Sequence, residues 1–115
     1  MNYHELRKAL EAVFSPDTAV PGSKTNPPSS GHCAAVALIV QALFGGQLVS
    51  TRLEGQSHWF NRIDDVDVDL TGDQFGYPPV QVGPNIYPET RVRTEDEVRM
   101  ETFIRAFRLA GKAGI

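Results

Sequence analysis

The chain has 115 residues, of which 41% are hydrophobic and 22% charged; this is enough apolar material for one packed domain over residues 1–115 and excludes a wholly disordered chain. Eleven basic residues against 14 acidic ones leave a net charge of −3, which argues against a nucleic-acid binder, because such proteins usually carry a basic surplus. The single cysteine, Cys33, excludes an internal disulfide and a cysteine-rich zinc module.

Two helices are predicted in the first part of the chain. Apolar residues recur at helical spacing over residues 3–14, and residues 16–31 are then rich in Pro, Gly, Ser, Thr and Asn, as in a loop. Residues 33–44 are apolar on every face except for Gln41 and are followed by Gly45-Gly46. This pattern is typical of a helix that is buried on all sides and has glycine at its C-terminal cap.

The hydrophobic period then changes to that of strands. Residues 48–53 predict one strand, and residues 58–63 and 66–71 predict two more, joined by Asp64-Asp65 as a two-residue hairpin turn. Residues 72–88 contain three Gly and four Pro and therefore predict mostly loop.

A last helix is predicted from Thr94, which forms a capping box with Glu97. Its basic side chains are offset by acidic ones and predict a solvated surface. The apolar stripe expected to face the core consists of Met100, Phe103, Ile104 and Phe107. The element order predicts a single α+β domain, in which a buried helix with Cys33 at its N-terminal end packs on a small antiparallel sheet between flanking helices.

Cys33 stands where the predicted buried helix begins. The positive end of the helix dipole and the unpaired backbone N–H groups there favour a thiolate. The same N–H groups can stabilise an oxyanion formed when that thiolate attacks a carbonyl. The alternative is that Cys33 is one more small apolar residue of the core, because free cysteine is among the most buried residue types.

The predicted hairpin brings a histidine and a carboxylate together. Its register pairs Ile63 with Val66, Arg62 with Asp67 and Asn61 with Val68. Since side chains alternate along a strand, His58 and Asp69 share one face as diagonal neighbours, ~7–8 Å apart between backbones, and their side chains can close this gap. Asp67 faces Arg62 and is expected to be a surface ion-pair partner. Trp59 lies on the other face, which is the core side.

A carboxylate at Asp69 can hold the His58 imidazole in one tautomer and stabilise its charged form. With Cys33 as nucleophile, His58 as base and Asp69 as orienting residue, the three residues form the set of a thiol hydrolase. If each residue is considered alone, the alternative interpretation is a surface histidine for His58 and a strand-end carboxylate for Asp69. A zinc site built from His32, Cys33, His58 and Asp69 is the rival chemistry, but these residues lack the close pair spacing typical of zinc sites. We therefore expect neither a metal nor a cofactor.

Several short motifs occur in order between roughly residues 15 and 75. They are Asn26-Pro27, Gly31-His32-Cys33, Ala37-Leu38-Ile39-Val40-Gln41, Phe44-Gly45-Gly46, His58-Trp59-Phe60-Asn61-Arg62-Ile63, Asp69-Leu70-Thr71 and Gln74-Phe75. This set resembles the YunG family of small bacterial proteins, with a weaker match in the final helix. The order Cys, His, Asp is also similar to that of papain-like and transglutaminase-like thiol enzymes. The resemblance implies a papain-like core with Cys33 as nucleophile, His58 as base and Asp69 as orienting residue.

Three further polar residues are candidates for binding the oxyanion or the substrate. The family usually has Gln where His32 stands, so the resemblance implies that His32 either donates to the oxyanion in its place or alters the activity. Asn26 precedes Pro27 and can bring a side-chain amide to the oxyanion, or it can simply form the turn. Gln74 can line the cleft or cap the end of a strand.

The predicted function is hydrolysis of an amide or ester in a small molecule or a peptide, or transfer of its acyl group, through a thioester on Cys33. Loops 16–31 and 72–88 flank the site and are expected to select the substrate, with Tyr77 and Tyr87 as contacts. The alternative is a non-catalytic binding or regulatory module on the same fold. The N-terminus lacks the apolar core of a secretory signal, and no segment approaches the ~20 apolar residues that cross a bilayer. We therefore expect a cytoplasmic protein without membrane or nucleic-acid partners.

Overall fold

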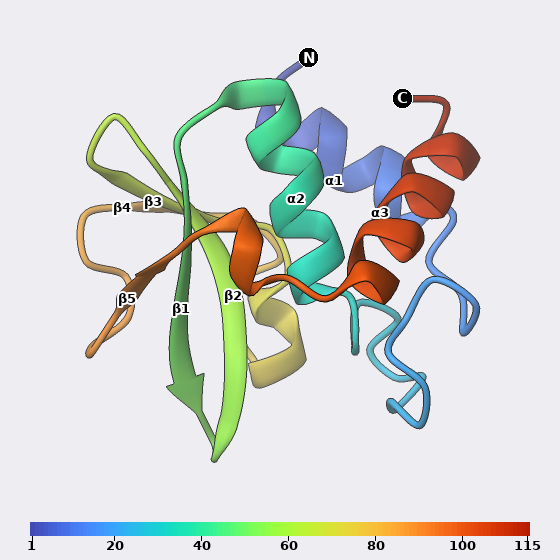
Figure 1. The fold of residues 1–115 in the computed structure, drawn as a ribbon, viewed down its shortest axis with the longest axis horizontal. Coiled ribbons are helices and arrows are strands. Elements are labelled where there is room, and N and C mark those ends of the chain that lie inside the picture. Colours follow the sequence, from blue (N-terminus) through green and yellow to red (C-terminus); the bar gives the residue numbers. More distant parts are fainter.

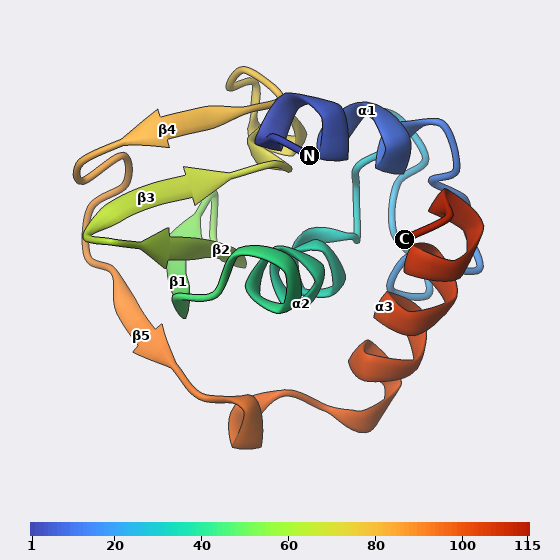
Figure 2. The ribbon, with the colours of Figure 1, turned by 90° about the horizontal axis from the view of Figure 1, so that it is seen from above.

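A computed structural model describes residues 1–115 and contains three α-helices and a five-stranded antiparallel sheet (Figures 1 and 2). The helices are α1 (Tyr3–Glu11), α2 (Cys33–Phe44) and α3 (Met100–Ala113), and the 3-10 turns are η1 (Gly72–Phe75) and η2 (Glu95–Glu97). The strands are β1 (Gln47–Leu53), β2 (Gln56–Ile63), β3 (Val66–Asp69), β4 (Gln81–Gly83) and β5 (Arg91–Arg93). The sheet order is β4-β3-β2-β1-β5, which confirms the predicted α+β class.

Helix α2 packs against the sheet, and Figure 2 shows it between the strands and the other two helices. Its residues 35–40 are all buried, as expected of a helix that is apolar on every face. Asn61 is the polar residue on the side of β2 that faces this helix, and its side-chain amide donates a hydrogen bond to the Ala37 carbonyl at 2.9 Å. The bond satisfies a buried polar group and fixes the position of α2 along β2.

The β2–β3 hairpin has the predicted register, with Ile63 opposite Val66 and Arg62 opposite Asp67. Asp64 and Asp65 both have positive φ, 51° and 62°, as a two-residue turn that matches the strand twist requires. Strand β3 ends at Asp69, and on the side of β2 it pairs with residues 61–63 and no others. The part of β2 that carries His58 therefore pairs with β1 alone, and its other edge stays open toward the start of α2.

The hairpin face that carries His58 and Asp69 is buried, contrary to the surface position expected for Asp67. Both carboxylates and the imidazole are at most 1% exposed. The covering segment is the connection between β4 and β5, whose Tyr87 packs with Phe60 in a second small core. Residues 72–88, predicted to be mostly loop, thus contain the short strand β4. Because β4 pairs with β3, the chain that follows β4 is directed across the sheet. Asp67 still forms the expected ion pair with Arg62, at 2.7 Å.

The last helix differs most from its prediction. The capping box of Thr94 and Glu97 closes the single turn η2, and α3 begins only at Met100. The side of α3 toward the core carries Ala106 and Leu109, whereas most of the predicted stripe is exposed. Phe103, Ala106 and Leu109 are three residues apart and so lie on one side of the helix, which is the side that packs on the core.

Trp59 lies on the core side of β2, as predicted, but is only half-buried. Its ring packs against the main core, and the Arg93 guanidinium lies over it at 5.4 Å from the ring centroid. We expect Trp59→Ala to lower the free energy of unfolding by about 2 kcal/mol, less than the ~3–5 kcal/mol of a fully buried aromatic. Urea denaturation measures the loss, and Val82→Ala, at an exposed position of β4, serves as the control that changes little. An unchanged midpoint for Trp59→Ala contradicts the packing of this ring on the core.

Candidate active site

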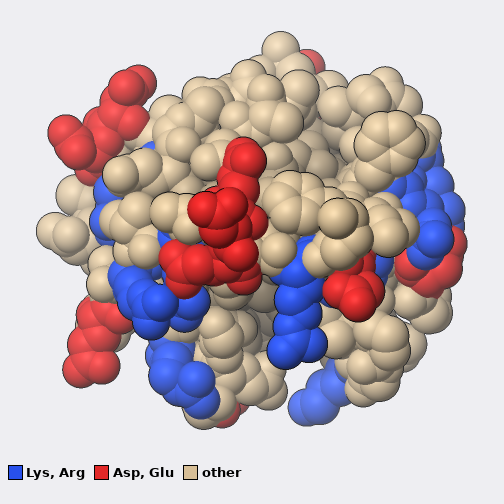
Figure 3. Space-filling view, viewed as in Figure 1, with Lys and Arg blue, Asp and Glu red and all other residues tan.

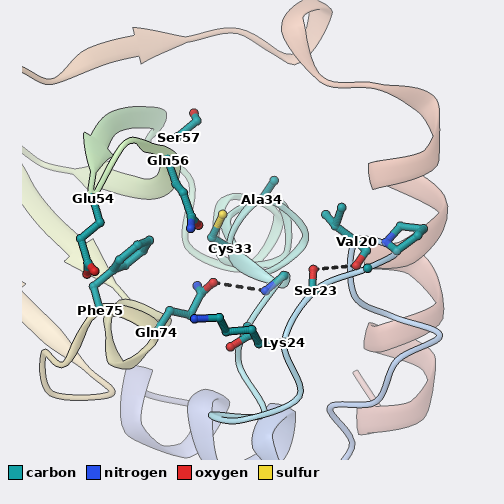
Figure 4. Close-up of a pocket in the computed structure, with 14 residues that line it drawn as sticks. Val20, Ser23, Lys24, Cys33, Ala34, Glu54, Gln56, Ser57, Gln74 and Phe75 are labelled. Carbon is teal, nitrogen blue, oxygen red and sulfur yellow. Dashed lines mark hydrogen bonds between the residues drawn. The ribbon is translucent and has the colours of Figure 1, made fainter.

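Cys33 is the first residue of α2 and is half-buried. The preceding residue, His32, caps the helix through its backbone only, and no side chain bonds the first turn. The first backbone N–H groups of a helix have no partner within the helix, and no acidic residue stands in this turn. The thiol therefore lies at an uncompensated positive helix end. It also lines an open cavity of about 480 Å³ (Figure 4).

His58 and Asp69 form the predicted pair. The Nε2–H of the imidazole donates to Oδ2 of Asp69 at 2.8 Å, and both side chains are almost completely buried. The other ring nitrogen, Nδ1, is buried and makes no hydrogen bond. The Cys33 thiol is near enough to the ring to raise the pKa of His58. Because Asp69 occupies Nε2, Nδ1 is the nitrogen that remains for the thiol, and the structure brings the three residues together.

The surroundings of His58 favour its charged form. Burial is the largest single influence on its pKa and acts to lower it, but the hydrogen bonds and charges of Asp69 and Cys33 together outweigh burial and raise the pKa of His58 to about 9. The imidazole is therefore protonated at neutral pH. A protonated ring beside a thiol can stabilise a thiolate and can later donate its proton to a leaving group.

Besides His58, Asp69 has three further hydrogen-bond donors that the sequence pattern did not reveal, the backbone N–H and the hydroxyl of Thr71 and the hydroxyl of Tyr87. Its Oδ1 accepts from the backbone N–H of Thr71 at 2.9 Å, and its Oδ2 also accepts from the Tyr87 hydroxyl. Gln81 in turn donates to that hydroxyl at 2.7 Å. Burial and the neighbouring carboxylate raise the pKa of Tyr87, so its hydroxyl stays protonated and acts as a donor. These bonds fix the carboxylate that orients His58.

Gly72 leaves the space that this network occupies. A Cβ atom there would lie 2.8 Å from the Tyr87 hydroxyl and 2.9 Å from both Oδ2 of Asp69 and Nε2 of Gln81. We expect Gly72→Ala to lower the free energy of unfolding by about 1–3 kcal/mol through overpacking and to slow alkylation of Cys33 by displacing Asp69. Gly111→Ala is the matched control, because nothing lies within 4 Å of that site on α3 and alanine is the better helix former by ~1 kcal/mol. Equal effects of the two substitutions contradict a role for this space.

The residues that precede Cys33 are fixed to η1 by a buried arginine. Arg7 of α1 donates to the Leu70 carbonyl at 2.7 Å and makes two bonds of 2.9 Å to Asp73. The same carboxylate accepts from the Ser29 hydroxyl at 2.8 Å. Burial acts to raise the pKa of Asp73, but Arg7 and Ser29 overcome this effect and lower it. The ion pair therefore connects α1, the loop before Cys33 and the turn that follows β3.

His32 does not face the cavity that Cys33 lines. Its Nδ1–H donates to the Ser30 carbonyl at 3.0 Å, its Nε2 lies 2.7 Å from the Thr18 hydroxyl, and its ring packs on Phe14. Burial lowers the pKa of His32 against the influence of nearby carbonyls, so the ring is neutral. With both nitrogens engaged, the side chain is not placed to donate to an oxyanion on Cys33.

The two other predicted oxyanion or substrate residues have different positions. Asn26 is exposed in the loop and does not line the cavity. Gln74 does line it, but its Oε1 accepts from the Gly31 N–H at 3.2 Å and its Nε2 donates to the Thr71 carbonyl at 3.0 Å. Gln74 therefore joins the loop before Cys33 to the residue that binds Asp69 (Figure 4).

The walls of the cavity include a segment that the sequence reasoning missed. The loop before α2 supplies one wall, η1 supplies Gln74 and Phe75, and the β1–β2 hairpin supplies Glu54, Gln56 and Ser57. Gln56 points toward Cys33 (Figure 4). It lies two residues before His58 and therefore on the same face of the strand. The sequence prediction missed Gln56 because the predicted strand began only at residue 58. Tyr77 and Tyr87, expected as substrate contacts, do not line this cavity.

No group of three or more His, Cys, Asp or Glu side chains converges in a way that can hold a metal ion. The zinc site considered above needs His32, which bonds Thr18 and Ser30 instead. No helix combines the length and the apolar character that crossing a bilayer requires.

Comparison with known proteins places the chain in one family. The family model described as "YunG protein" matches residues 2–108. A Bacillus subtilis (strain 168) protein with the name "Uncharacterized protein YunG" is 41% identical over 51 residues, which span 44% of this chain and 44% of that relative. No solved structure matches the chain significantly. Because the family model covers nearly the whole sequence, the chain belongs to the YunG family.

Proposed function

We propose that this protein is a thiol-dependent acyl hydrolase with Cys33 as nucleophile, His58 as acid and base, and Asp69 as orienting carboxylate. The observation that carries the proposal is the buried imidazole, which bonds Asp69 through Nε2 and leaves Nδ1 for a thiol at the edge of an open cavity. Burying a charged ring costs free energy unless its partners compensate. Such an arrangement beside a half-exposed cysteine fits thiol chemistry better than a purely structural role.

The first step forms a thioester. The thiolate sulfur of Cys33 attacks the carbonyl carbon of an amide or ester, and the π electrons of the carbonyl move to its oxygen. The carbon–oxygen double bond then re-forms as the bond to the leaving nitrogen or oxygen breaks, and the proton on Nδ1 of His58 passes to that atom. The products of this step are the free amine or alcohol, an acyl group on the sulfur and a neutral imidazole.

The second step restores the enzyme. The neutral imidazole of His58 takes a proton from a water molecule as its oxygen attacks the thioester carbon. The carbon–sulfur bond breaks, and the acid leaves with thiolate and imidazolium again in place. An amine or alcohol in the position of this water gives acyl transfer instead. Asp69 keeps the ring in the orientation that both steps need.

The oxyanion has two sources of stabilisation in this site. The free N–H groups at the start of α2 lie beside the sulfur, and the side-chain amide of Gln56 points toward it (Figure 4). The order Cys, His, Asp, with the thiol on a helix and the imidazole on an antiparallel strand, is also similar to that of papain-like thiol enzymes. This similarity supports acyl chemistry and suggests a papain-like core.

The test is acylation by p-nitrophenyl acetate, followed by nitrophenolate release and by intact mass. The expected result is acetylated Cys33 that turns over in the native protein and no adduct in Cys33→Ala. In His58→Ala the adduct should form more slowly, because the imidazolium is lost, and should then persist, because the base for deacylation is absent. Gln56→Ala should reduce the acylation rate by roughly 10-fold if its amide donates to the oxyanion. If native Cys33 reacts no faster than an unfolded peptide thiol, the protein is a binding or regulatory module and the hydrolase proposal is wrong.

A further inference from the structure

Helix α3 directs three large apolar side chains away from the core. Met100, Ile104 and Phe107 are 70%, 50% and 85% exposed. They are four and three residues apart, so they form a continuous stripe on one side of the helix. Single exposed apolar residues are common, but a contiguous patch usually marks an interaction surface.

A hollow of about 360 Å³ between α2 and α3 adjoins this stripe. Seven of the nine residues that line it are hydrophobic, and they include Leu38, Ile39, Phe103 and Phe107. Figure 3 shows uncharged surface across the upper part of this face, with a cluster of acidic side chains near its middle and basic side chains below. The stripe and the hollow together form one apolar surface, which is called the α3 face below.

The charges beside the stripe are complementary to those of a second, antiparallel copy of the same helix. Glu101 and Arg108 are seven residues apart and so lie on the same side of the helix, near opposite ends of the stripe. Glu101 makes no ion pair within the chain, and Arg108 bonds only the Asp17 carbonyl, at 2.7 Å. A two-fold axis between Ile104 and Arg105 would set Glu101 of each copy opposite Arg108 of the other, because antiparallel helices reverse the order of the charges.

We propose that two copies of this chain associate through their α3 faces, with the α3 helices antiparallel. In this arrangement Phe107 of each copy lies against the first turn of the other copy's α3, beside Met100. The apolar stripe then becomes the centre of the interface, and the two Glu101–Arg108 pairs lie at its ends. The cavity beside Cys33 is lined by other segments, so association leaves it open.

The test is the molar mass in solution, measured by light scattering and sedimentation at about 0.1 mM protein. The expected mass is twice 12.6 kDa. Phe107→Glu should produce a monomer with unchanged helix content, because Phe107 is 85% exposed and its replacement does not disturb the fold. Val82→Glu, at a 51% exposed position of β4, is the matched control and should remain dimeric.

The charge pair sets the register of the proposed interface. Glu101→Arg and Arg108→Glu should each weaken the dimer by roughly 10-fold or more, because each places like charges opposite one another. The double variant with both substitutions should restore dimerisation. A monomeric native protein, a dimer that persists in Phe107→Glu, or a double variant no tighter than the single ones overturns the proposal.

Discussion

Iodoacetamide is expected to alkylate Cys33 of the native protein at least ~10-fold faster than the same cysteine in an unfolded peptide, at about pH 6.5. A free thiol is only ~1% ionised at this pH, and the thiolate is the reacting species. The expectation rests on the two groups beside the sulfur, the imidazole of His58 with its raised pKa and the start of α2. The gain is smaller than the change in thiolate fraction, because a stabilised thiolate is also a weaker nucleophile.

Three variants separate the parts of the triad. His58→Ala should reduce the rate to nearly that of the peptide, because the imidazolium is lost. Asp69→Asn should reduce it partially, since the ring keeps a hydrogen-bond acceptor but loses the adjacent negative charge. Asp67→Asn is the matched control: it removes a buried carboxylate that bonds Arg62 and the Ile86 N–H, not the histidine. A native rate equal to that of the peptide, or a larger effect of Asp67 than of Asp69, refutes the triad assignment.

Local sequence patterns were sufficient to predict the central part of the candidate site. A segment that is apolar except for Gln41 specifies a buried helix over residues 33–44, and Asp64-Asp65 at the turn specifies the hairpin register. Because strand alternation is strict, the register alone places His58 and Asp69 on one face. The bond between them at 2.8 Å follows from two short-range patterns.

The parts that the sequence did not predict depend on contacts between distant segments. Strands β4 and β5 have three residues each and no distinctive periodicity, so the chain that covers His58 was expected to be loop. The bond from Tyr87 to Asp69 spans 18 residues and needs the space at Gly72. No local pattern identifies such a partner.

Helix α3 shows a different limit of prediction from the sequence. Two apolar stripes are available on it, one with Ala106 and Leu109 and one with Ile104 and Phe107. Periodicity favours the stripe with Ile104 and Phe107, but the structure packs the side with Ala106 and Leu109 on the core. His32 shows the same dependence on context, because its direction is decided by Thr18 and Ser30 rather than by its neighbour Cys33.

Raising the pH is expected to destabilise the protein specifically through His58. Its pKa is raised from the ordinary 6.5 to about 9 in the folded state, so the folded protein binds this proton more tightly than the unfolded chain. The resulting stabilisation is fully present below about pH 6.5 and is lost as the pH rises through about 9, where both states release the proton. The pKa difference corresponds to a loss of about 3 kcal/mol.

Urea denaturation of the native protein and His58→Gln at about pH 6 and pH 10 measures this loss. The difference between their free energies of unfolding should fall by about 3 kcal/mol as the pH rises, because glutamine bonds Asp69 without titrating. Cys33→Ala should keep only part of the pH dependence, since the thiol supplies part of the rise in the His58 pKa. His4→Gln, an exposed position on α1, should show no comparable change. A difference for His58→Gln that is constant with pH means that the imidazole is not held charged, and the thiolate–imidazolium pair is then absent.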